Sequence, residues 1–396
     1  MQHNALGRRY KVALVAPSME ILGGQAVQAD RLIRAWRADP DVEAWLVPIN
    51  PVPAGPLGHA TRIKYVRTFM TQLAYWPMLL RELRCADIVH VFSASYWSFL
   101  LAPFPAVVTA KLLGKPVVMN YRSGEAPDHL RRSTIARATL RWVDCNAVPS
   151  RFLQEVFSAH GIPAEVIPNI VDLDRFAFHQ RGPLRPLLLS TRNFEPLYNV
   201  ACTLQTFRLV QERYPDATLT LVGGGSQEQS LRALARELGL RNVRFAGRVP
   251  PDDIWRYYAE ADIYLQTPDI DNMPSSVLEA FASGCAVVST NAGGVPAILT
   301  DSVHGCLVPC NDHEAAAQRI VSVLENPDLA ARLTGRARRS CEAYRWDAVR
   351  TQWLALYRQL LDHGAPSRHA VRGNVGRESA TGADTADSTT SASNAI

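Results

Sequence analysis

Two carboxylates and two serines stand close together just after a predicted strand. Asp271 and Glu279 are eight residues apart, and Ser275 and Ser276 follow Pro274 at the predicted start of a helix. The free amides at a helix start attract an anion, and a carboxylate one turn further on can accept hydrogen bonds from two ribose hydroxyls. We therefore expect this stretch to bind a nucleotide sugar. Each residue also has a simpler interpretation, because aspartate often forms turns and a helical glutamate is usually solvated.

Glycine-rich loops follow two other predicted strands. Gly23 and Gly24 precede the first predicted helix, where glycine lets the backbone approach a ligand closely. The run 223–225 fits two interpretations equally well, a phosphate-binding loop and a tight strand-to-helix turn. Neither loop comes with both the Gly-x-Gly-x-x-Gly pattern and an acidic residue at the end of the next predicted strand, and the sequence contains no Gly-x-x-x-x-Gly-Lys-Ser/Thr loop. A dinucleotide dehydrogenase and a P-loop enzyme are therefore disfavoured.

The elements that must position these residues follow a regular rhythm. Short β-rich apolar runs alternate with helical stretches, which indicates parallel α/β units. The predicted strands cover residues 11–16, 44–48, 87–92, 116–120, 145–149, 187–190, 218–222, 243–246, 263–266, 286–289 and 306–308. Proline and glycine cluster between residues 169 and 186, where we expect an interdomain linker. The 396 residues are then expected to form two doubly wound parallel-sheet domains, over 1–175 and 183–345, with ligands at the carboxyl ends of the strands.

Charge and composition exclude other classes of function. The net charge of +5 is too small and too scattered for nucleic-acid binding, and it divides into +6 up to residue 180 and −1 beyond it. None of the four lysines lies beyond Lys115, so an anion in the second half must be bound by arginine, helix starts or backbone amides. Residues 364–396 are mostly Ser, Thr, Ala, Asp and Gly, which predicts a disordered tail without a catalytic role.

Cysteine usage favours a reducing compartment without a metal. Seven cysteines are scattered along the chain and no apolar leader precedes them, so a cytoplasmic location is expected. His304, Cys306, Cys310 and His313 have a spacing that suggests zinc, but they lack the paired Cys-x-x-Cys pattern of such sites. We therefore predict no metal.

Two segments raise the question of a membrane. Residues 88–110 contain no charge, but their serines and prolines favour a strand followed by a helix over a membrane span. Residues 61–84 combine basic and aromatic side chains, which fits either an interfacial helix or an ordinary amphipathic helix interrupted at Pro77, the latter being favoured. Peripheral contact with the inner face of the plasma membrane through 61–84 stays open.

Several segments together resemble the retaining glycosyltransferases of family 4, which have the GT-B fold of two Rossmann-like domains facing a central cleft. The resemblance covers about residues 10–360. The segments that carry it are 23–24, 190–196, 221–225, 243–249, 271–284, 289–296, 305–308 and 344–346, and the block ending in Leu278-Glu279-Ala280 is the most specific.

The resemblance implies a nucleoside-diphosphate sugar as donor, held mainly by the second domain without a cofactor or metal. It implies that Arg192 contacts the pyrophosphate, that the helix-start amides of Ser275 and Ser276 also face that anion, and that Glu279 binds the ribose. Further donor-binding positions are Gly23, Gly24, Gly224, Arg248, Val249, Asn272 and Met273. The first domain would bind a carbohydrate or lipid-linked acceptor, and the last helix, about 346–362, would pack back on it.

Three positions depart from the family pattern. Tyr198 stands where a lysine is usual, and Asn199 follows it in place of glycine. Asp271 replaces the first glutamate of the Glu-x7-Glu pair, although we still expect Asp271 and Arg192 to be catalytic. The usual histidine after the fourth strand is missing, and Arg122 or Glu125 is the candidate for its role, while His90 is expected to be a core residue rather than a base.

The expected activity is transfer of a sugar with retention, in cell-envelope polysaccharide or glycolipid biosynthesis. Two alternatives stay open: a nucleotide-sugar epimerase of related fold, and a degenerate partner protein without activity.

Overall fold

The computed structural model describes residues 9–20, 23–51, 64–93 and 95–362. The predicted tail over 364–396 and the first residues of the segment 61–84 lie outside the described residues. We refer to residues 9–166 together with the last helix as the first lobe, and to residues 187–344 as the second lobe. Both lobes belong to one compact unit.

The first lobe is built on a six-stranded parallel sheet in the order β2-β1-β3-β4-β5-β6. Its strands are β1 (Tyr10–Ala16), β2 (Val42–Pro48), β3 (Ile88–Ser93), β4 (Val117–Tyr121), β5 (Cys145–Val148) and β6 (Glu165–Val166). All residues of β3 and β4 are buried, as expected for central strands of a sheet covered on both faces. The short β6 was not predicted, because two residues carry no periodicity.

The second lobe repeats this architecture with the order β12-β11-β10-β7-β8-β9, again all parallel. Its strands are β7 (Leu187–Ser190), β8 (Thr218–Val222), β9 (Val243–Gly247), β10 (Ile263–Gln266), β11 (Ala286–Thr290) and β12 (Cys306–Val308). The order in which the strands are added to the sheet reverses at β7: β8 and β9 follow on one side of it, and β10, β11 and β12 on the other. Such a reversal opens a crevice at the carboxyl ends of the strands, where ligands bind.

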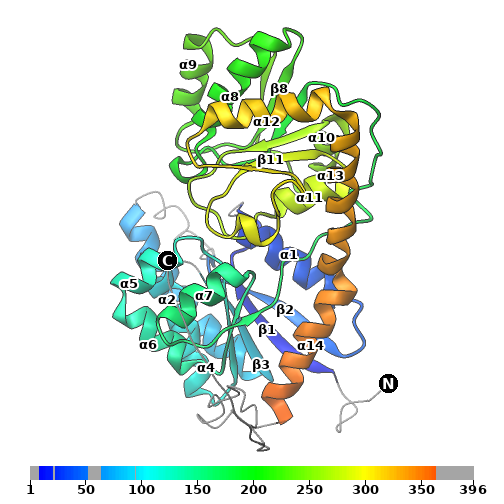
Figure 1. Ribbon diagram of the computed structural model, residues 1–396. Coiled ribbons are helices and arrows are strands. Elements are labelled where there is room, and N and C mark those ends of the chain that lie inside the picture. The colour runs from blue at the N-terminus through cyan, green and yellow to red at the C-terminus, as the bar shows by residue number, and fades with distance from the viewer. Residues whose placement is uncertain (1–8, 21–22, 52–63, 94, 363–396) are drawn as a thin grey trace, which may run out of the picture. The chain divides into compact units, whose positions relative to one another are not determined.

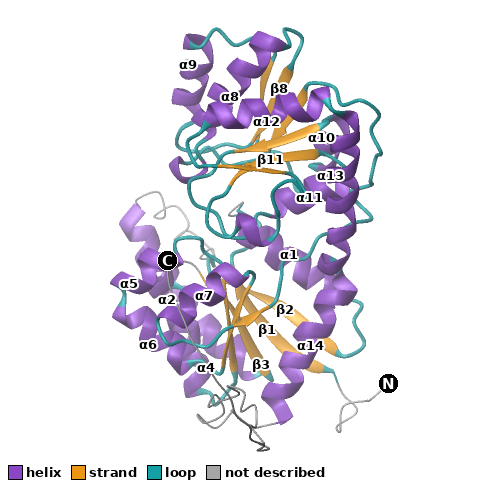
Figure 2. Ribbon diagram, in the orientation of Figure 1, coloured by secondary structure: helices purple, strands orange, loops and turns teal. Residues whose placement is uncertain are grey.

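Helices cover both faces of each sheet (Figure 2). They are α1 (Gly24–Trp36), α2 (Lys64–Arg84), α3 (Tyr96–Leu101), α4 (Pro103–Leu112), α5 (Ala126–Arg132), α6 (Thr134–Trp142), α7 (Arg151–Ala159), α8 (Val200–Arg213), α9 (Glu228–Glu237), α10 (Trp255–Glu260), α11 (Ser275–Ser283), α12 (His313–Glu325), α13 (Pro327–Ser340) and α14 (Trp346–Asp362). Alternate residues of β1 enter two different hydrophobic clusters, Ala13 and Val15 on one face and Val12 and Leu14 on the other. Each sheet is therefore the middle layer of three.

The last helix, α14, follows the second lobe in sequence but packs on the first (Figure 1). Trp353 and Tyr357 join the cluster of Val12 and Leu14, and Trp346 meets the ring of Trp36 edge-on with centroids 4.6 Å apart. The chain thus crosses between the lobes twice.

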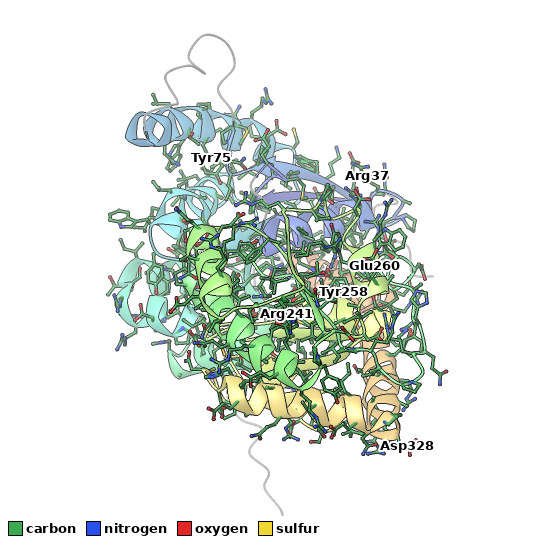
Figure 3. All side chains as sticks on the ribbon, turned by 90° about the horizontal axis from the view of Figure 1, so that it is seen from above. Arg37, Tyr75, Arg241, Tyr258, Glu260 and Asp328 are labelled. Carbon is green, nitrogen blue, oxygen red and sulfur yellow. The ribbon has the colours of Figure 1, made fainter. Side chains whose placement is uncertain are left out.

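The helix α2 runs without a break through Pro77, contrary to the interruption expected from the sequence. Proline removes one N–H from the helix, but Pro77 and Leu73 are exposed, so water can bond the carbonyl that loses its partner. Tyr75, labelled in Figure 3, is buried on the opposite side and donates its hydroxyl to the carbonyl of Ala102 at 3.1 Å. Within the described ranges, no helix combines the length and the apolar character needed to cross a bilayer.

Candidate active site

An arginine–aspartate pair lies at the carboxyl ends of two neighbouring strands of the second lobe. Arg192 follows β7 by two residues and Asp271 follows β10 by five, and these strands pair directly. Nη2 of Arg192 donates to Oδ2 of Asp271 at 2.6 Å, while Nη1 donates to Oγ of Ser276 at 3.2 Å. Only about a tenth of each charged side chain is exposed, at 10% and 11%. The pair is therefore largely removed from water.

Burial and charge shift the pKa values of Arg192 and Asp271 in opposite directions. Burial alone would lower the pKa of Arg192, but the carboxylate of Asp271 reverses this, so the pKa lies above its usual value. Burial raises the pKa of Asp271, against the opposing effects of the Arg192 charge and the Asn272 amide. Nε of Arg192 is buried and has no partner among the described residues. The guanidinium thus keeps unused capacity to bind an anion.

Tyr198 supplies an aromatic face to the same guanidinium. It ends a short 3-10 turn, Pro196–Tyr198, and the Arg192 guanidinium carbon lies 4.0 Å from its ring centroid. Burial raises the pKa of Tyr198, so the ring stays neutral at physiological pH. Tyr198 therefore brings a cation–π contact where family members have a second positive charge.

The next residue, Asn199, explains how the chain replaces the usual glycine. Its φ of 43° is in the left-handed region, which asparagine tolerates better than most residues. Its Oδ1 accepts from the amide of Cys202 at 3.2 Å and caps α8.

The helix α11 begins directly beside Arg192. Ser275 and Ser276 form its first turn, whose backbone amides have no partner within the helix. Glu279 lies one turn further on, and its carboxylate meets Arg31 from α1 of the first lobe at 2.5 Å. Gly293, in the loop after β11, packs against this region, since a Cβ there would overlap the carbonyl of Asp271 and its φ is +49°.

The glycine run 223–225 packs against the loop that carries Arg192. Gly223 has a φ of +154°, and a Cβ on it would overlap the carbonyl of Arg192. This close approach favours the tight-turn interpretation over a phosphate cradle. Gly224 does not line the cleft described below, whereas Gly223 does.

The first lobe contributes Arg122, which follows β4. Its Nη1 donates to Oδ1 of Asn120 at 3.2 Å, and its guanidinium lies 5.3 Å from the ring centroid of Phe92. Burial lowers the pKa of Arg122 to about 9, and its Nη2 is buried without a partner among the described residues. Asn272 donates to the carbonyl of Arg122 at 3.4 Å, which joins this loop to the loop of Asp271.

His90 lies inside the first lobe, as expected for a core residue. The side-chain amide of Asn120 lies 3.0 Å from Nε2 and the hydroxyl of Tyr357 lies 2.7 Å from Nδ1. Burial, together with the charge of Arg122, lowers the pKa of His90 to about 3. Fully buried, with a partner at each ring nitrogen, the imidazole is part of the core.

One cleft of about 390 Å³ lies between the two lobes. Twelve of the thirteen site residues expected from the sequence line it, Gly224 being the exception. They are Gly23, Gly24, Arg122, Arg192, Arg248, Val249, Asp271, Asn272, Met273, Ser275, Ser276 and Glu279. Glu125, Tyr198 and two residues not expected from the sequence, Gln28 and Arg31, line it as well. Gln28 and Arg31 lie on one face of a predicted helix, and nothing in the sequence indicated that this face meets the second lobe.

The cysteine and histidine spacing near residue 306 forms no metal site. In the part of the chain that the structure describes, no three His, Cys, Asp or Glu residues are grouped so that they could hold an ion. Cys306 is instead buried in β12 as part of the core.

Two family models together match most of the chain. Residues 22–175 match the model described as Glycosyltransferase Family 4, and residues 174–340 match the one described as Glycosyl transferases group 1. The phosphatidyl-myo-inositol mannosyltransferase of Mycobacterium tuberculosis is 26% identical over 385 residues, which cover 90% of this chain and 98% of the relative. The sulfoquinovosyl transferase SQD2 of Arabidopsis thaliana is 25% identical over 314 residues, which cover 73% of this chain and 60% of the relative.

Solved structures agree in fold. A sucrose-phosphate synthase from Thermosynechococcus elongatus has a TM-score of 0.70 at 21% identity, over 89% of this chain and 100% of that chain. Anabaena HepE, crystallised with UDP and glucose, has a TM-score of 0.69 at 16% identity over the same shares. With the two family models, these findings confirm the resemblance noted in the sequence. The chain therefore belongs to glycosyltransferase family 4 and is a retaining glycosyltransferase with the GT-B fold.

Proposed function

We propose that this protein transfers a hexose from a nucleoside-diphosphate sugar to a lipid-linked or carbohydrate acceptor, in cell-envelope polysaccharide or glycolipid biosynthesis. The observation that carries the proposal is the convergence of Arg192, the first turn of α11 and Glu279 on one cleft between two Rossmann-like lobes. This set offers positive charge, free amides and a carboxylate, which are the groups that a diphosphate and a ribose require.

The donor diphosphate would bind where Arg192 and the first turn of α11 meet. As the sugar leaves, negative charge grows on the β-phosphate, and fixed dipoles and a buried guanidinium stabilise that charge most strongly when water is excluded. An incoming phosphate competes with Asp271 for Arg192, and this frees the carboxylate to turn toward the sugar. Arg122, whose buried Nη2 has no partner among the described residues, is the first-lobe candidate for a contact with the reacting groups.

Retention fits a reaction on one face of the sugar. The acceptor hydroxyl would attack from the side that the phosphate leaves, and the departing phosphate would take the acceptor proton. This assignment needs no histidine base, in keeping with the buried position of His90. Structural relatives crystallised with UDP and with UDP-glucose support a uridine nucleotide as the first donor to test.

The acceptor proposal rests on the surface of the first lobe. Exposed apolar side chains gather on α2 and the adjoining α3, where Trp97 is 77% and Leu73 is 56% exposed. Gln72 of α2 donates to the carbonyl of Leu101 at 2.9 Å and so ties the two helices together. Arg81 on α2 is 80% exposed. Exposed aromatic and basic side chains on these two helices suit peripheral contact with an anionic membrane, from which a lipid-linked acceptor could enter the cleft. The mannosyltransferase relatives, named for a phosphatidyl-inositol substrate, support the same class of acceptor.

The test is glycosyl transfer, donor hydrolysis and calorimetric binding with UDP-, GDP- and ADP-sugars, measured for wild type, Glu279→Ala and the control Glu237→Ala. Loss of a charge-assisted hydrogen bond to the donor should lower kcat/KM about 10- to 100-fold in Glu279→Ala. Glu237 is exposed on α9, so the control should behave as wild type. Equal activity of all three proteins would refute the site. Release of an epimerised sugar without acceptor would indicate an epimerase, and no binding of any nucleotide sugar would indicate a partner protein.

A further inference from the structure

Two helices from different lobes meet side by side at the donor cleft. Gln28 of α1 donates through Nε2 to Oγ of Ser275 at 2.8 Å, and Arg31 of α1 donates through Nη2 to Oε1 of Glu279 at 2.5 Å. Gln28 and Arg31 are three residues apart on α1, and their partners on α11 are four residues apart. Both contacts therefore form from one face of each helix. We call these four residues the α1–α11 clasp.

The main chain between the lobes closes the clasp. The carbonyl of Ile170 accepts from Gln28 and from Arg31, each at 3.2 Å, and the amide of Ile170 donates to Oε1 of Gln28 at 3.1 Å. Ile170 itself joins the core of the first lobe. Gln28 and Arg31 are therefore held from two directions, and their side chains are oriented before any ligand arrives.

The clasp is not an ordinary surface ion pair. The side chains of Arg31 and Glu279 are 15% and 9% exposed, and Gln28 is 3% exposed. Such a pair loses much of its hydration, and Arg31 is fixed in geometry because it also donates to the carbonyl of Ile170. By contrast the contact between Arg34, one turn further along α1, and Asp252 of the second lobe, at 3.3 Å, is exposed.

Both second-lobe members of the clasp are residues that we assign to the donor. Ser275 belongs to the first turn of α11, and Glu279 is the proposed ribose-binding carboxylate. Arg31 and Glu279 both line the cleft, and the guanidinium of Arg31 contacts the carboxylate of Glu279. A carboxylate accepts more than one hydrogen bond, so Glu279 can bind a hydroxyl while Arg31 holds it.

We propose that Arg31, with Gln28, is a positioning residue that fixes Glu279 for the ribose, so that recognition of the ribose diol requires both lobes. The proposal rests on the function proposed above and names the part of the donor on which the first lobe acts. Its consequence is selective. Loss of Arg31 weakens the binding of nucleotides that carry the two ribose hydroxyls and leaves the diphosphate contribution, carried by Arg192, intact.

The experiment measures calorimetric Kd values of UDP, GDP and ADP for wild type, and then of the 2′,3′-dideoxy form of whichever nucleotide binds. Arg31→Ala and Arg31→Gln are compared with the control Arg34→Ala. Arg31→Gln keeps a donor for the Ile170 carbonyl, so it serves if Arg31→Ala fails to fold. We expect wild type and the control to prefer the ribonucleotide about tenfold, and the Arg31 variants to lose that preference with an unchanged Kd for the dideoxy form.

The outcomes separate this inference from the proposed function. Nucleotide binding with the same ribose preference in wild type and in the Arg31 variants would overturn the role of Arg31 alone. A uniform loss of affinity for both nucleotide forms would also overturn it, because that is what general damage to the cleft produces. Failure of wild type to bind any of the three nucleotides would overturn the proposed function, and this inference with it.

Discussion

Removing Arg192 should destabilise the second lobe before any effect on activity is considered. The pair with Asp271 spans 2.6 Å with about a tenth of each side chain exposed, so little solvent screening applies. At an effective dielectric constant of about 20, the attraction across that distance is about 6 kcal/mol, and part of it offsets the cost of removing both charges from water. Breaking such a pair costs about 3 to 5 kcal/mol, because the remaining charge stays buried alone. We expect a loss of about 3 kcal/mol in Arg192→Ala, the lower end, since Asp271 borders the cleft.

The assay is urea denaturation followed by far-UV circular dichroism, for wild type, Arg192→Ala, Asp271→Asn and the double variant. A loss of about 3 kcal/mol corresponds to a midpoint about 1 M lower in urea. The double variant should be about as stable as Asp271→Asn, so the two changes should not add. The control Arg208→Ala breaks a pair whose side chains are 50% and 60% exposed, and it should lie close to wild type.

The pH dependence gives a second test of the same reasoning. In Arg192→Ala, the pKa of Asp271 should rise further above its unfolded value, because burial then acts without the opposing positive charge. A carboxyl whose folded pKa is raised binds more protons in the folded state, so its ionisation destabilises the fold as the pH increases. The deficit of Arg192→Ala should therefore shrink when the pH is lowered from neutral. Unchanged stability of Arg192→Ala at neutral pH, or effects of the two changes that simply add, would refute this account.

Three further predictions concern other parts of the molecule. Burial lowers the pKa of His90 to about 3, so as the pH falls the unfolded chain binds a proton at His90 before the folded chain does. The free energy of unfolding, measured by urea titration, should therefore fall by about 2 to 3 kcal/mol between pH 6.5 and 4.5. In His90→Gln the fall should be smaller. Gly293→Ala should weaken UDP binding, measured by calorimetry, about tenfold. Gly239→Ala should not, because Gly239 also has a positive φ but has open space around it. Equal Kd values for the two variants would contradict the assigned packing of Gly293. Trp97→Ser should reduce flotation with anionic vesicles at low salt, whereas Trp255→Ser in the second lobe should not, and flotation of neither parent nor variants would remove the membrane proposal.

Much of the fold could be read from local patterns. Eleven of the twelve strands of the described chain were expected within a few residues of their bounds, because buried parallel strands are short, continuous apolar runs. The exception, β6, has two residues and depends on its pairing with β5. The helix α2 continues through Pro77 because that part of its surface faces water, which the sequence did not reveal.

The candidate site likewise has residues that local sequence indicates and contacts that only the structure shows. Asp271, Ser275 and Glu279 could be selected from the sequence because each follows a strand end or a helix start, and those positions are marked by local residue types. Arg192 is indicated only by the family resemblance. The sequence marks Tyr198 only as a departure from the family pattern, and its place against the Arg192 guanidinium comes from the turn that carries it.

Strand periodicity, loop chemistry and the family motifs by themselves determined the two-sheet architecture and the second-lobe half of the cleft. Only the tertiary structure decided that α1 brings Gln28 and Arg31 to Ser275 and Glu279, and that Arg192 is already paired with Asp271. The physical reason is the range of the interactions. Strand and helix signals depend on neighbours within a few residues, whereas the contacts of α1 with α11 join side chains almost 250 positions apart and exist only once both lobes and the chain between them are folded.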